Sequence, residues 1–427
     1  MLIFQASREL RIKTVDTLSS PYYKAMNTGT NNSELDFFKT PIGAKAPTIM
    51  QVLPALNSGG VERGTLEISD ALVAVGWNSI VVSKGGSMVK ELTENGGVHI
   101  TLNAGSKNPL KWFKCYCRLL GVISKYDVNL IHARSRIPAW LSLGAATWTK
   151  TPFITTFHGR YRDTNSFKRL YNSVMTRGEK TIAISKYIAM EIVHRHNLNP
   201  EKIYTIPRGV DLEFFNKNSV SSDRTNKLRY KWSLPKGIPV IMLPGRVTRW
   251  KGHELLIDSL SKLKDLPFFC IIVGPFDDKK EFKKSLEKRI EKNNLASKII
   301  FAGDCLDMAA AYKLSNVVVS ASLDPEPFGR IIIEAQAMGC LVIASNHGGA
   351  VESIVDQKTG WLFEACDSFA LATTLRKVLN LSKNTKSMVS SNATAHIKAN
   401  FSKKDMCMRT LSVYSETLGF SQIENHK

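Results

Sequence analysis

Two glutamates, Glu326 and Glu334, stand in the run DPEPFGRIIIEA, which covers residues 324–335. The apolar stretch before this run predicts a buried strand, and a helix is expected to begin near Phe328. Backbone amides at the start of a helix favour anions and hydroxyl-rich ligands. Glu334 is about two helical turns beyond Glu326, so the two residues are expected on roughly the same face, and carboxylates are good acceptors for vicinal sugar hydroxyls. Each glutamate alone also fits a solvated position, but the apolar flanks make that reading harder for the pair.

A second run, PGRVTRWKG at residues 244–252, leaves an apolar strand and enters a helix. Gly245 lets the backbone turn close to a ligand. Arg246 and Lys251 can converge on one diphosphate, because arginine offers a planar fork of donors and lysine offers a compact charge. The alternative is two surface cations beside a glycine turn, and it stays open because basic residues are abundant in this chain.

Apolar runs alternate with helical patterns on both sides of these motifs, and the resulting elements must position them. In the first half, strands are predicted at residues 48–54, 78–83, near 98, 128–132, 153–157, 181–185 and 202–206, with helices at residues 61–75 and 87–95. In the second half, strands are predicted at residues 238–243, 268–273, 299–301, 317–320 and 341–344, with helices at residues 251–263, 281–293, 328–338, 369–379 and 403–418. Such alternation predicts parallel sheets with right-handed crossovers. Ligand sites are then expected at the carboxyl ends of the strands, where two such halves face each other across a cleft.

The length of 427 residues also favours two domains, because a single core stops growing at roughly 250–300 residues. The expected order is a poorly ordered N-terminal extension (residues 1–46), a first Rossmann-like domain (47–212), a linker that includes a short helix (213–237), a second Rossmann-like domain (238–402), and a C-terminal helix and tail (403–427). The predicted fold class is therefore α/β, with two parallel-sheet domains.

The composition narrows the class of protein further. Apolar residues make up 43% of the chain, so it can bury real cores and is not disordered. The seven cysteines include no C-x-x-C pair, which fits neither a disulfide framework nor a zinc site and favours a reducing compartment. No signal-peptide pattern and no stretch of about 20 apolar residues is present, so no membrane span is expected. The net charge of +21 implies an anionic partner, which can be nucleic acid, a membrane surface or a phosphate-rich substrate.

Many of these cations gather on one predicted helix, in the run SKNPLKWFKCYCRLLGVISKY at residues 106–126. When this run is wound as a helix, five cations fall within an arc of roughly 60°, and the apolar residues, Phe113 among them, are predicted on the opposite side. The five are Lys107, Lys111, Lys114, Arg118 and Lys125. A second basic and aromatic stretch spans residues 160–171. We interpret the five-cation face as a site for an anionic membrane surface or a lipid phosphate, and the alternative is a solvated face of an outer helix.

Together the two motifs resemble those of the retaining glycosyltransferases of the GT-B fold, family 4. That family carries Gly-Arg, four residues and Lys-Gly in its second domain, and then two glutamates separated by seven residues. The flanks at residues 273–274, 301–303, 348–349 and 359–362 are also typical of it. The resemblance covers about residues 48–418 and is looser in the first half. The sequence RGVD at residues 208–211 departs from the usual Asn-Gly-Val-Asp and adds a cation there.

The resemblance implies a role for each matching position. Arg246 and Lys251 would neutralise the donor diphosphate, Glu326 would hold hydroxyls of the transferred sugar, and Glu334 would hold the ribose. His158 follows a predicted strand and would lie beside the transferred sugar, although a hydrogen-bonded structural histidine is the alternative. The implied catalytic set is His158, Arg246, Lys251 and Glu326, and the implied donor-binding set is Gly59, Gly60, Gly245, Arg246, Lys251, Phe328, Gly329, Arg330, Ile331 and Glu334.

These roles imply retaining transfer of a hexose from a UDP- or GDP-linked donor to a glycolipid or lipopolysaccharide-type acceptor. No Asp-x-Asp pair occurs, so no metal and no other cofactor is expected, and the two cations would stabilise the departing phosphate. No carboxylate nucleophile with a partner acid stands out, which favours attack on the same face as the leaving phosphate. The expected location is cytoplasmic, peripheral on the inner face of the cytoplasmic membrane.

Two other classes remain as alternatives. One is a nucleotide-sugar epimerase of the same fold, against which the Gly-Arg…Lys-Gly motif argues. The other is a basic nucleic-acid-binding protein, which the charge alone suggests. No zinc-finger, RNP-type or helix-turn-helix pattern supports the latter, so no nucleic-acid partner is expected.

Overall fold

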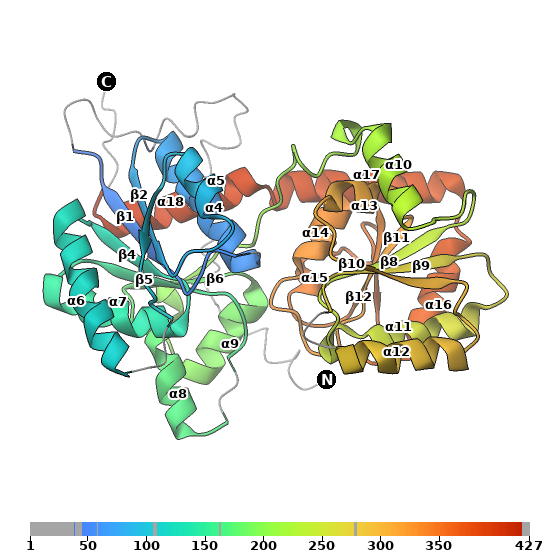
Figure 1. The fold of residues 1–427 in the computed structure, drawn as a ribbon, viewed down its shortest axis with the longest axis horizontal. Helices are drawn as coiled ribbons and strands as arrows, with labels where there is room; N and C mark the ends of the chain where they lie inside the picture. Colours follow the sequence, from blue (N-terminus) through green and yellow to red (C-terminus); the bar gives the residue numbers. More distant parts are fainter. Residues whose placement is uncertain are drawn as a thin grey trace. The chain divides into compact units, whose positions relative to one another are not determined.

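The computed structural model describes residue 38 and residues 45–57, 59–105, 109–161, 164–276 and 280–420. Backbone contacts divide the chain into two compact units: unit 1 is Met1–Pro207 with Lys404–Lys427, and unit 2 is Arg208–Lys403 (Figure 1). Each unit is built around its own parallel sheet with connecting helices. The predicted α/β class with two Rossmann-like domains is therefore confirmed.

Among the described residues, the sheet of unit 1 has the strand order β3-β2-β1-β4-β5-β6-β7. Its strands are β1 (Thr48–Val52), β2 (Asn78–Ser83), β3 (Val98–Thr101), β4 (Leu130–Ala133), β5 (Phe153–Phe157), β6 (Lys180–Ala183) and β7 (Ile203–Thr205). The order reverses at β1, which pairs in parallel with both β2 and β4. All five residues of β1 are buried, as expected for a strand that is covered on both faces. Loops at the carboxyl ends of β1 and β4 therefore border the switch point, where ligands bind in such sheets.

The helices of unit 1 lie between these strands in chain order, except α18, which follows unit 2 in the sequence. They are α4 (Gly60–Ala74), α5 (Val89–Glu94), α6 (Pro109–Tyr126), α7 (Arg136–Thr149), α8 (Ser166–Asn172), η3 (Ser173–Thr176), α9 (Lys186–His196), η4 (Pro200–Lys202) and α18 (Lys403–Thr417). The helices expected at residues 61–75 and 87–95 correspond to α4 and the shorter α5.

In unit 2, the described strands follow the order β10-β9-β8-β11-β12-β13. They are β8 (Val240–Pro244), β9 (Phe269–Val273), β10 (Ile299–Gly303), β11 (Val317–Ser320), β12 (Leu341–Ser345) and β13 (Trp361–Phe363). The helices are η5 (Lys217–Ser219), α10 (Ser222–Lys231), η6 (Arg249–Lys251), α11 (His253–Leu260), η7 (Ser261–Leu263), α12 (Lys280–Lys292), α13 (Met308–Leu314), α14 (Arg330–Ala337), α15 (Ala350–Ser353), α16 (Ser368–Leu379) and α17 (Lys383–Asn400). The order reverses between β8 and β11, so the loops after these two strands form the corresponding switch point.

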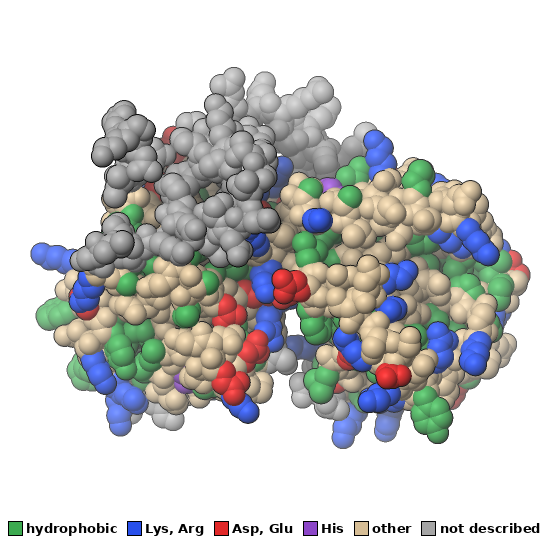
Figure 2. Space-filling model, turned by 90° about the horizontal axis from the view of Figure 1, so that it is seen from above, with side chains coloured by type: hydrophobic (Ala, Val, Ile, Leu, Met, Phe, Trp, Pro, Cys, Tyr) green, Lys and Arg blue, Asp and Glu red, His purple; other side chains and the backbone are tan. Residues whose placement is uncertain are grey.

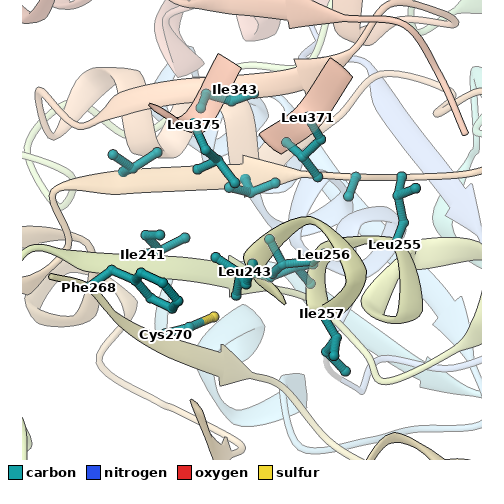
Figure 3. Close-up of a cluster of buried hydrophobic side chains, with 14 of the residues drawn as sticks. Ile241, Leu243, Leu255, Leu256, Ile257, Phe268, Cys270, Ile343, Leu371 and Leu375 are labelled. Carbon is teal, nitrogen blue, oxygen red and sulfur yellow. The ribbon is translucent and has the colours of Figure 1, made fainter. Parts of the chain in front are cut away.

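Apolar side chains on one face of this second sheet form a core cluster with the helices that cover it. Figure 3 shows Ile241 and Leu243 of β8 close to Leu256 of α11 and to Phe268. Ile241 and Leu256 are fully buried, and Leu243 and Phe268 are at most 2% exposed. Dense packing of this kind fixes where each strand ends, and therefore fixes the loops that carry the site.

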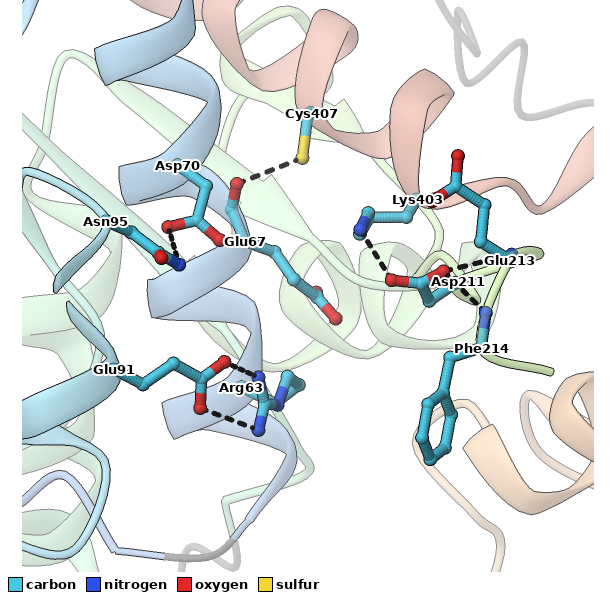
Figure 4. A network of polar contacts seen from close by, with 10 residues as sticks. All are labelled: Arg63, Glu67, Asp70, Glu91, Asn95, Asp211, Glu213, Phe214, Lys403 and Cys407. Atoms are coloured by element: carbon cyan, nitrogen blue, oxygen red, sulfur yellow. Dashed lines mark hydrogen bonds and ion pairs between the residues drawn. The ribbon is translucent and has the colours of Figure 1, made fainter. Parts of the chain in front are cut away.

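The last helix, α18, belongs to unit 1 although it follows unit 2 in the sequence. Its buried Tyr414 shares a 2.7 Å hydrogen bond with Nδ1 of His132 in β4, 282 residues away in sequence. Cys407 donates from Sγ to the backbone oxygen of Glu67 in α4 (Figure 4). The segment expected as a separate helix and tail is therefore part of the first unit's core from Lys404 onward.

The segment at residues 213–237, expected as a linker with a short helix, is part of unit 2 and contains such a helix. It carries α10, whose Arg224 makes a bidentate ion pair with Asp307 at 2.6 and 2.8 Å. Close to the boundary between the units, Lys403 Nζ donates to Asp211 Oδ2 at 2.5 Å (Figure 4). The Val210 amide donates to the Phe401 oxygen at 2.8 Å, so the two stretches of unit 2 nearest that boundary are held together.

Candidate active site

The carboxyl end of β8 carries the first predicted motif. Pro244 ends the strand, and Gly245 adopts a φ of +133°, a conformation that a side chain disfavours. The loop then approaches β11 so closely that a Cβ at Gly252 would lie 1.8 Å from the oxygen of Ala321. Glycine at this position is what allows Lys251 to reach the end of the neighbouring strand.

A second glycine loop packs against the motif that follows β11. The Gly349 amide donates to the Glu326 oxygen at 2.7 Å. A Cβ at Gly348, whose φ is +66°, would lie 2.6 Å from that same oxygen. The sequence reading treated the Gly348–Gly349 pair only as a typical flank; the structure shows that it fixes the turn bearing Glu326.

The structure brings Lys251 and Glu326 together in one ion pair. Lys251 Nζ donates to Glu326 Oε1, and the two side chains are only 14% and 8% exposed. Ser322, which is buried, donates to the same Oε1 at 2.6 Å. Among the described residues, no hydrogen bond to Oε2 of Glu326 is present, so the lone pairs of this oxygen remain for a ligand. This arrangement suits a carboxylate that accepts hydrogen bonds from the hydroxyl groups of a ligand.

Glu334 lies on α14 and has its own partners. Tyr312, which is fully buried on α13, donates its hydroxyl to Glu334 Oε2 at 3.1 Å. Arg330, one turn earlier on α14, pairs with Oε1 at 3.2 Å. Burial raises the pKa of the Tyr312 hydroxyl well above its ordinary value, and the nearby charge of Glu334 adds to the shift, so the hydroxyl keeps its proton. The prediction that this pair of glutamates is not a surface feature is consistent with their exposures of 6% and 9%.

The helix bearing Glu334 begins at Arg330, two residues later than expected. Glu326 therefore lies in the preceding turn, outside the helix, and the argument from two helical turns does not apply to it. Gly329 caps the helix with a φ of +92°, and Phe328 is buried with its ring centroid 5.9 Å from that of Phe401. Ile331 is partly buried on the first turn.

Arg246 differs from the other predicted site residues because its side chain is exposed. Within the described part of the chain, no acidic side chain lies within ion-pair distance of it. An arginine in this state, on the same loop as Lys251, has its guanidinium donors available for an anion.

His253, directly after the motif, was not singled out from the sequence. It is fully buried, and its Nδ1 lies 3.2 Å from the Thr248 oxygen, so Nδ1 carries the hydrogen. Its Nε2 is buried without a hydrogen-bond partner. Burial lowers the pKa of this imidazole to about 4, and the charge of Lys251 contributes in the same direction. We conclude that His253 is neutral and holds the loop by its contact with Thr248.

In unit 1, the predicted site residues lie at strand ends. His158 immediately follows β5 and is partly buried. Thr156, two residues earlier, shares a 2.7 Å hydrogen bond with His132 Nε2. Because His132 also bonds Tyr414, a line of hydrogen bonds from Thr156 through His132 to Tyr414 stabilises this strand end. Gly59 and Gly60 begin α4 after β1. The separate placement of these groups at the carboxyl ends of β1 and β5 agrees with the predicted topology.

The basic helix is α6, and three of the five predicted cations can be placed. Lys114, Arg118 and Lys125 are all exposed, whereas Lys107 and the side chain of Lys111 lie outside the described residues. The opposite side packs inward as expected, with Cys115, Leu119 and Ile123 buried. One expectation is wrong: the side chain of Phe113 is 73% exposed, because it lies beyond the edge of the strip that packs on the unit. On the face seen in Figure 2, Lys and Arg side chains are spread over both units.

The described residues include neither a metal-binding cluster nor a membrane-spanning helix. No group of three or more His, Cys, Asp or Glu side chains there could hold a metal ion. None of the helices in the described ranges is both long and apolar enough to cross a membrane. The seven cysteines, all in described positions, are free thiols.

Comparison with known proteins gives matches to both units. A model of the family described as Glycosyltransferase Family 4 matches residues 58–214, and a model described as Glycosyl transferases group 1 matches residues 224–396. A solved glycosyltransferase from Rickettsia africae ESF-5 is 39% identical, with a TM-score of 0.83, and the match covers 88% of this chain and 100% of that one.

Two more distant proteins show how far the likeness extends. The Anabaena protein Alr3699/HepE, solved in complex with UDP and glucose, has a TM-score of 0.77 at 20% identity, with 87% of this chain and 100% of that chain covered. A D-inositol 3-phosphate glycosyltransferase of Xylanimonas cellulosilytica is 27% identical over 210 residues, which are 48% of this chain. The match spans about half the length of that curated relative, 50%. With both family models and the Rickettsia structure in agreement, this chain belongs to the glycosyltransferases of the GT-B type, a family 4 domain followed by a group 1 domain, and is an enzyme that transfers sugars.

Proposed function

We propose that this enzyme transfers a hexose from a nucleotide-diphosphate sugar to a lipid-linked or lipopolysaccharide-type saccharide, with retention at the anomeric carbon and without a metal. The observation that carries the proposal is the buried contact between Lys251 and Glu326 at the strand ends of unit 2. It sets a cation for the diphosphate directly beside a carboxylate for the sugar.

The hydrogen-bonding capacity of this pair supports the donor assignment. Glu326 Oε1 accepts from Lys251 and from Ser322, which leaves Oε2 to accept from sugar hydroxyls. An ammonium has three N–H donors, so Lys251 keeps two for phosphate oxygens after its contact with Glu326. The exposed Arg246 adds a fork of donors on the same loop. That HepE was solved with UDP and glucose is consistent with this class of donor.

The same cations support a reaction that does not require a divalent ion. The bond between the anomeric carbon and the β-phosphate oxygen breaks, and the acceptor oxygen bonds to that carbon on the same face. The departing phosphate gains negative charge, which Arg246 and Lys251 would stabilise in place of a metal. Its oxygen would take the proton from the acceptor hydroxyl, so protons and charge balance without a further base.

The acceptor assignment rests on charge. The net charge of +21 and the exposed cations of α6 suit an anionic lipid surface, which would keep the enzyme peripheral on the inner face of the cytoplasmic membrane. The name of the Xylanimonas relative suggests a competing acceptor, a small phosphorylated inositol in water. Both acceptors are anionic, so an experiment must separate them.

The test is a two-step assay of the purified full chain. UDP- and GDP-linked hexoses are first compared by thermal shift, and the donor that stabilises the protein is then used in radiolabelled form. We expect the label to move into an organic-extractable lipopolysaccharide-type or glycolipid product with the α or β configuration of the donor, as read by NMR. Label in D-inositol 3-phosphate would show that this molecule, not a lipid-linked saccharide, is the acceptor. Inversion of the anomeric configuration would refute the retaining mechanism. Interconversion of donor sugars without transfer would indicate an epimerase.

A further inference from the structure

A hollow on the surface of unit 1 adjoins His158 at the carboxyl end of β5. Phe157 and Gly159, which precede and follow this histidine, line the hollow together with side chains of α9. Its apolar lining includes Ile188 and Ile192, which are each 1% exposed. The hollow holds about 210 Å³ of space, part of it open to solvent, whereas a water molecule takes about 30 Å³ in the liquid. A ligand group of several non-hydrogen atoms can therefore enter it.

Two arginines of this hollow share one acidic partner. Arg160 Nε lies 3.0 Å and Arg195 Nε lies 2.6 Å from the same atom, Oε2 of Glu191. Because each arginine reaches this oxygen with its Nε, the terminal N–H donors of both guanidinium groups are not needed for the contact. Neither arginine forms an ion pair with a second acidic side chain in the described ranges. Two positive charges are thus held together against one negative charge.

A third cation, Arg136, packs on Tyr161 of the same lining. Its guanidinium carbon is 4.5 Å from the centre of the Tyr161 ring and 5.4 Å from that of the Tyr171 ring. Arg136 donates to Oδ1 of Asn172 at 2.8 Å, and the described part of the chain offers it no acidic partner. Burial raises the pKa of Tyr161 to about 12, although Arg136 opposes the shift, so the hydroxyl keeps its proton and can donate. The excess of positive charge favours an anion here.

The side chains of the hollow suit a phosphate in particular. Guanidinium forks match the geometry of phosphate oxygens, and such charge-assisted hydrogen bonds are stronger than neutral ones. The buried apolar side chains of the lining lower the local dielectric constant, which strengthens the attraction. They would also contact a hydrocarbon group attached to the phosphate. The hollow therefore matches a phosphate that carries an apolar chain.

Helix α8 offers an apolar surface for the rest of such a molecule. Phe167 and Leu170 are 84% and 55% exposed, and because they are three positions apart they share one side of the helix. The two residues between them are exposed cations. The same helix carries Tyr171, whose ring packs on Arg136, so α8 is joined to the cationic cluster. An exposed apolar and basic surface of this kind favours a lipid as the source of the phosphate.

We propose that this hollow binds a phosphate of the lipid-linked acceptor, with Arg160 and Arg195 as the residues that contact it. The proposal rests on the proposed function, in which the acceptor saccharide is linked to a lipid. Glu191 holds both guanidinium groups in position for the phosphate oxygens. Because the hollow adjoins His158, a phosphate bound there would bring the attached saccharide to the strand end where the transferred sugar is expected.

The test measures binding to the full chain by calorimetry. The donor site is first saturated with whichever of UDP and GDP binds more tightly, so that Arg246 and Lys251 do not bind the probes. The probes are octyl phosphate below its micelle concentration, inorganic phosphate, D-inositol 3-phosphate and octyl glucoside. We expect octyl phosphate to bind at least about 10-fold more tightly than the other three, because it alone combines a phosphate with an apolar chain.

Substitutions of the two arginines identify the site. Arg160→Gln and Arg195→Gln should each weaken octyl phosphate binding by about 10-fold or more, as the loss of a charged hydrogen bond does. Each single variant leaves Glu191 paired with the other arginine, so folding should be retained, and an unchanged nucleotide affinity verifies it. In the transfer assay, KM for the lipid-linked acceptor should rise by a similar factor.

The matched control is Arg63→Gln on α4. Arg63 also belongs to unit 1 and pairs with a glutamate, Glu91, and its side chain is 38% exposed, compared with 40% for Arg160. This variant removes the same charge away from the hollow and should leave octyl phosphate binding and KM for the acceptor unchanged.

The outcomes separate this site from the proposed function. Wild-type affinity for octyl phosphate in both arginine variants would overturn the site, whereas label in an organic-extractable product would still support the proposed function. Equal affinity for octyl phosphate and D-inositol 3-phosphate would show that the hollow binds free phosphates, which overturns the lipid assignment. Label found only in D-inositol 3-phosphate would refute the lipid-linked acceptor itself.

Discussion

Lys251 and Glu326 are 75 positions apart in the sequence, yet their side chains form an ion pair that is 14% and 8% exposed. One follows β8 and the other follows β11, the two strands at which the order of the unit 2 sheet reverses. The pair therefore balances the charge of the site before any ligand arrives. Both side chains can still bind a nucleotide sugar, because each retains hydrogen-bonding positions beyond this contact.

The first prediction separates the activity of this pair from its stability. Glu326→Gln and Lys251→Met should each lower kcat by about 10²–10³, because a preorganised charge contact to the transition state is lost. Each single variant should also be less stable, by up to about 3–5 kcal/mol, because one largely buried charge is left without its partner. Transfer assays and urea unfolding of the same preparations measure the two effects.

The double variant Lys251→Met with Glu326→Gln is the control for that experiment. It removes both charges, so much of the stability should return, whereas activity should stay at the level of the weaker single variant. Near-normal turnover in either single variant would remove the pair from the active site. Arg249 belongs to the same loop, and its side chain is 73% exposed. The matched substitution Arg249→Met should affect neither activity nor stability strongly.

The alternation of elements was predictable from the sequence because fully covered strands read as apolar runs. Residues 317–320 and 78–83 were predicted as strands with the bounds that β11 and β2 have. Helix α17 and strand β13 were missed. Helix α17 shows only Val389, Ala393 and Ile397 as buried positions, too few in 18 residues for a clear helical stripe.

The site was predictable only where its residues are sequence neighbours. The spacing of Arg246, Lys251 and the two glutamates could be read directly. Ser322 and Tyr312 could not, because a serine after a strand and a tyrosine in an apolar helix have no local signal that names a distant partner. The return of α18 to unit 1 was hidden for the same reason: the contact between Tyr414 and His132 joins residues 282 positions apart.

The second prediction concerns metals. We expect full transfer activity in excess EDTA, because Arg246 and Lys251 supply the positive charge that the leaving diphosphate requires. A time course with and without EDTA measures this, and an added excess of magnesium should not raise the rate. Loss of activity in EDTA that magnesium or manganese restores would show that the leaving group is metal-bound.

The third prediction uses His253, whose pKa is lowered by burial from 6.5 to about 4. Below pH 6.5 the unfolded chain binds a proton that the folded chain excludes, so stability should fall as the pH drops from 6.5 towards 4. The expected loss between pH 7 and pH 5 is about 2 kcal/mol, out of a full penalty of about 3 kcal/mol. Urea unfolding should be measured at each pH. The unfolding transition of unit 2 is the one whose midpoint shifts when the nucleotide is added.

His253→Asn tests this assignment because an asparagine amide can still donate to the Thr248 oxygen. This variant should lose the extra pH dependence between pH 7 and pH 5. The same change at the exposed His194 should keep the wild-type dependence. Identical slopes in wild type and His253→Asn would show that another group is responsible.

The last prediction concerns the exposed face of α6. Lys114, Arg118 and Lys125 should hold unit 1 on anionic lipid, and each cation near such a surface contributes about 1 kcal/mol. Wild type should therefore pellet with anionic vesicles at low salt and not with neutral ones. High salt should release it, because the Debye length shrinks from about 10 Å at 0.1 M to about 3 Å at 1 M. Changing all three cations to glutamate should abolish pelleting while nucleotide affinity stays the same.

The exposure of Phe113 adds a component that salt should not remove. Its side chain is 73% exposed next to Lys114, so it can enter the lipid surface when the cations bind. We expect Phe113→Ser to weaken vesicle binding by a similar factor at low and at moderate salt, because apolar burial is not screened. Tyr230→Ser is the matched control, since Tyr230 is 89% exposed between Arg229 and Lys231 in unit 2 and should not contribute. If the triple glutamate variant pellets as the wild type does, this helix is only a solvated face and the charge of +21 serves another partner.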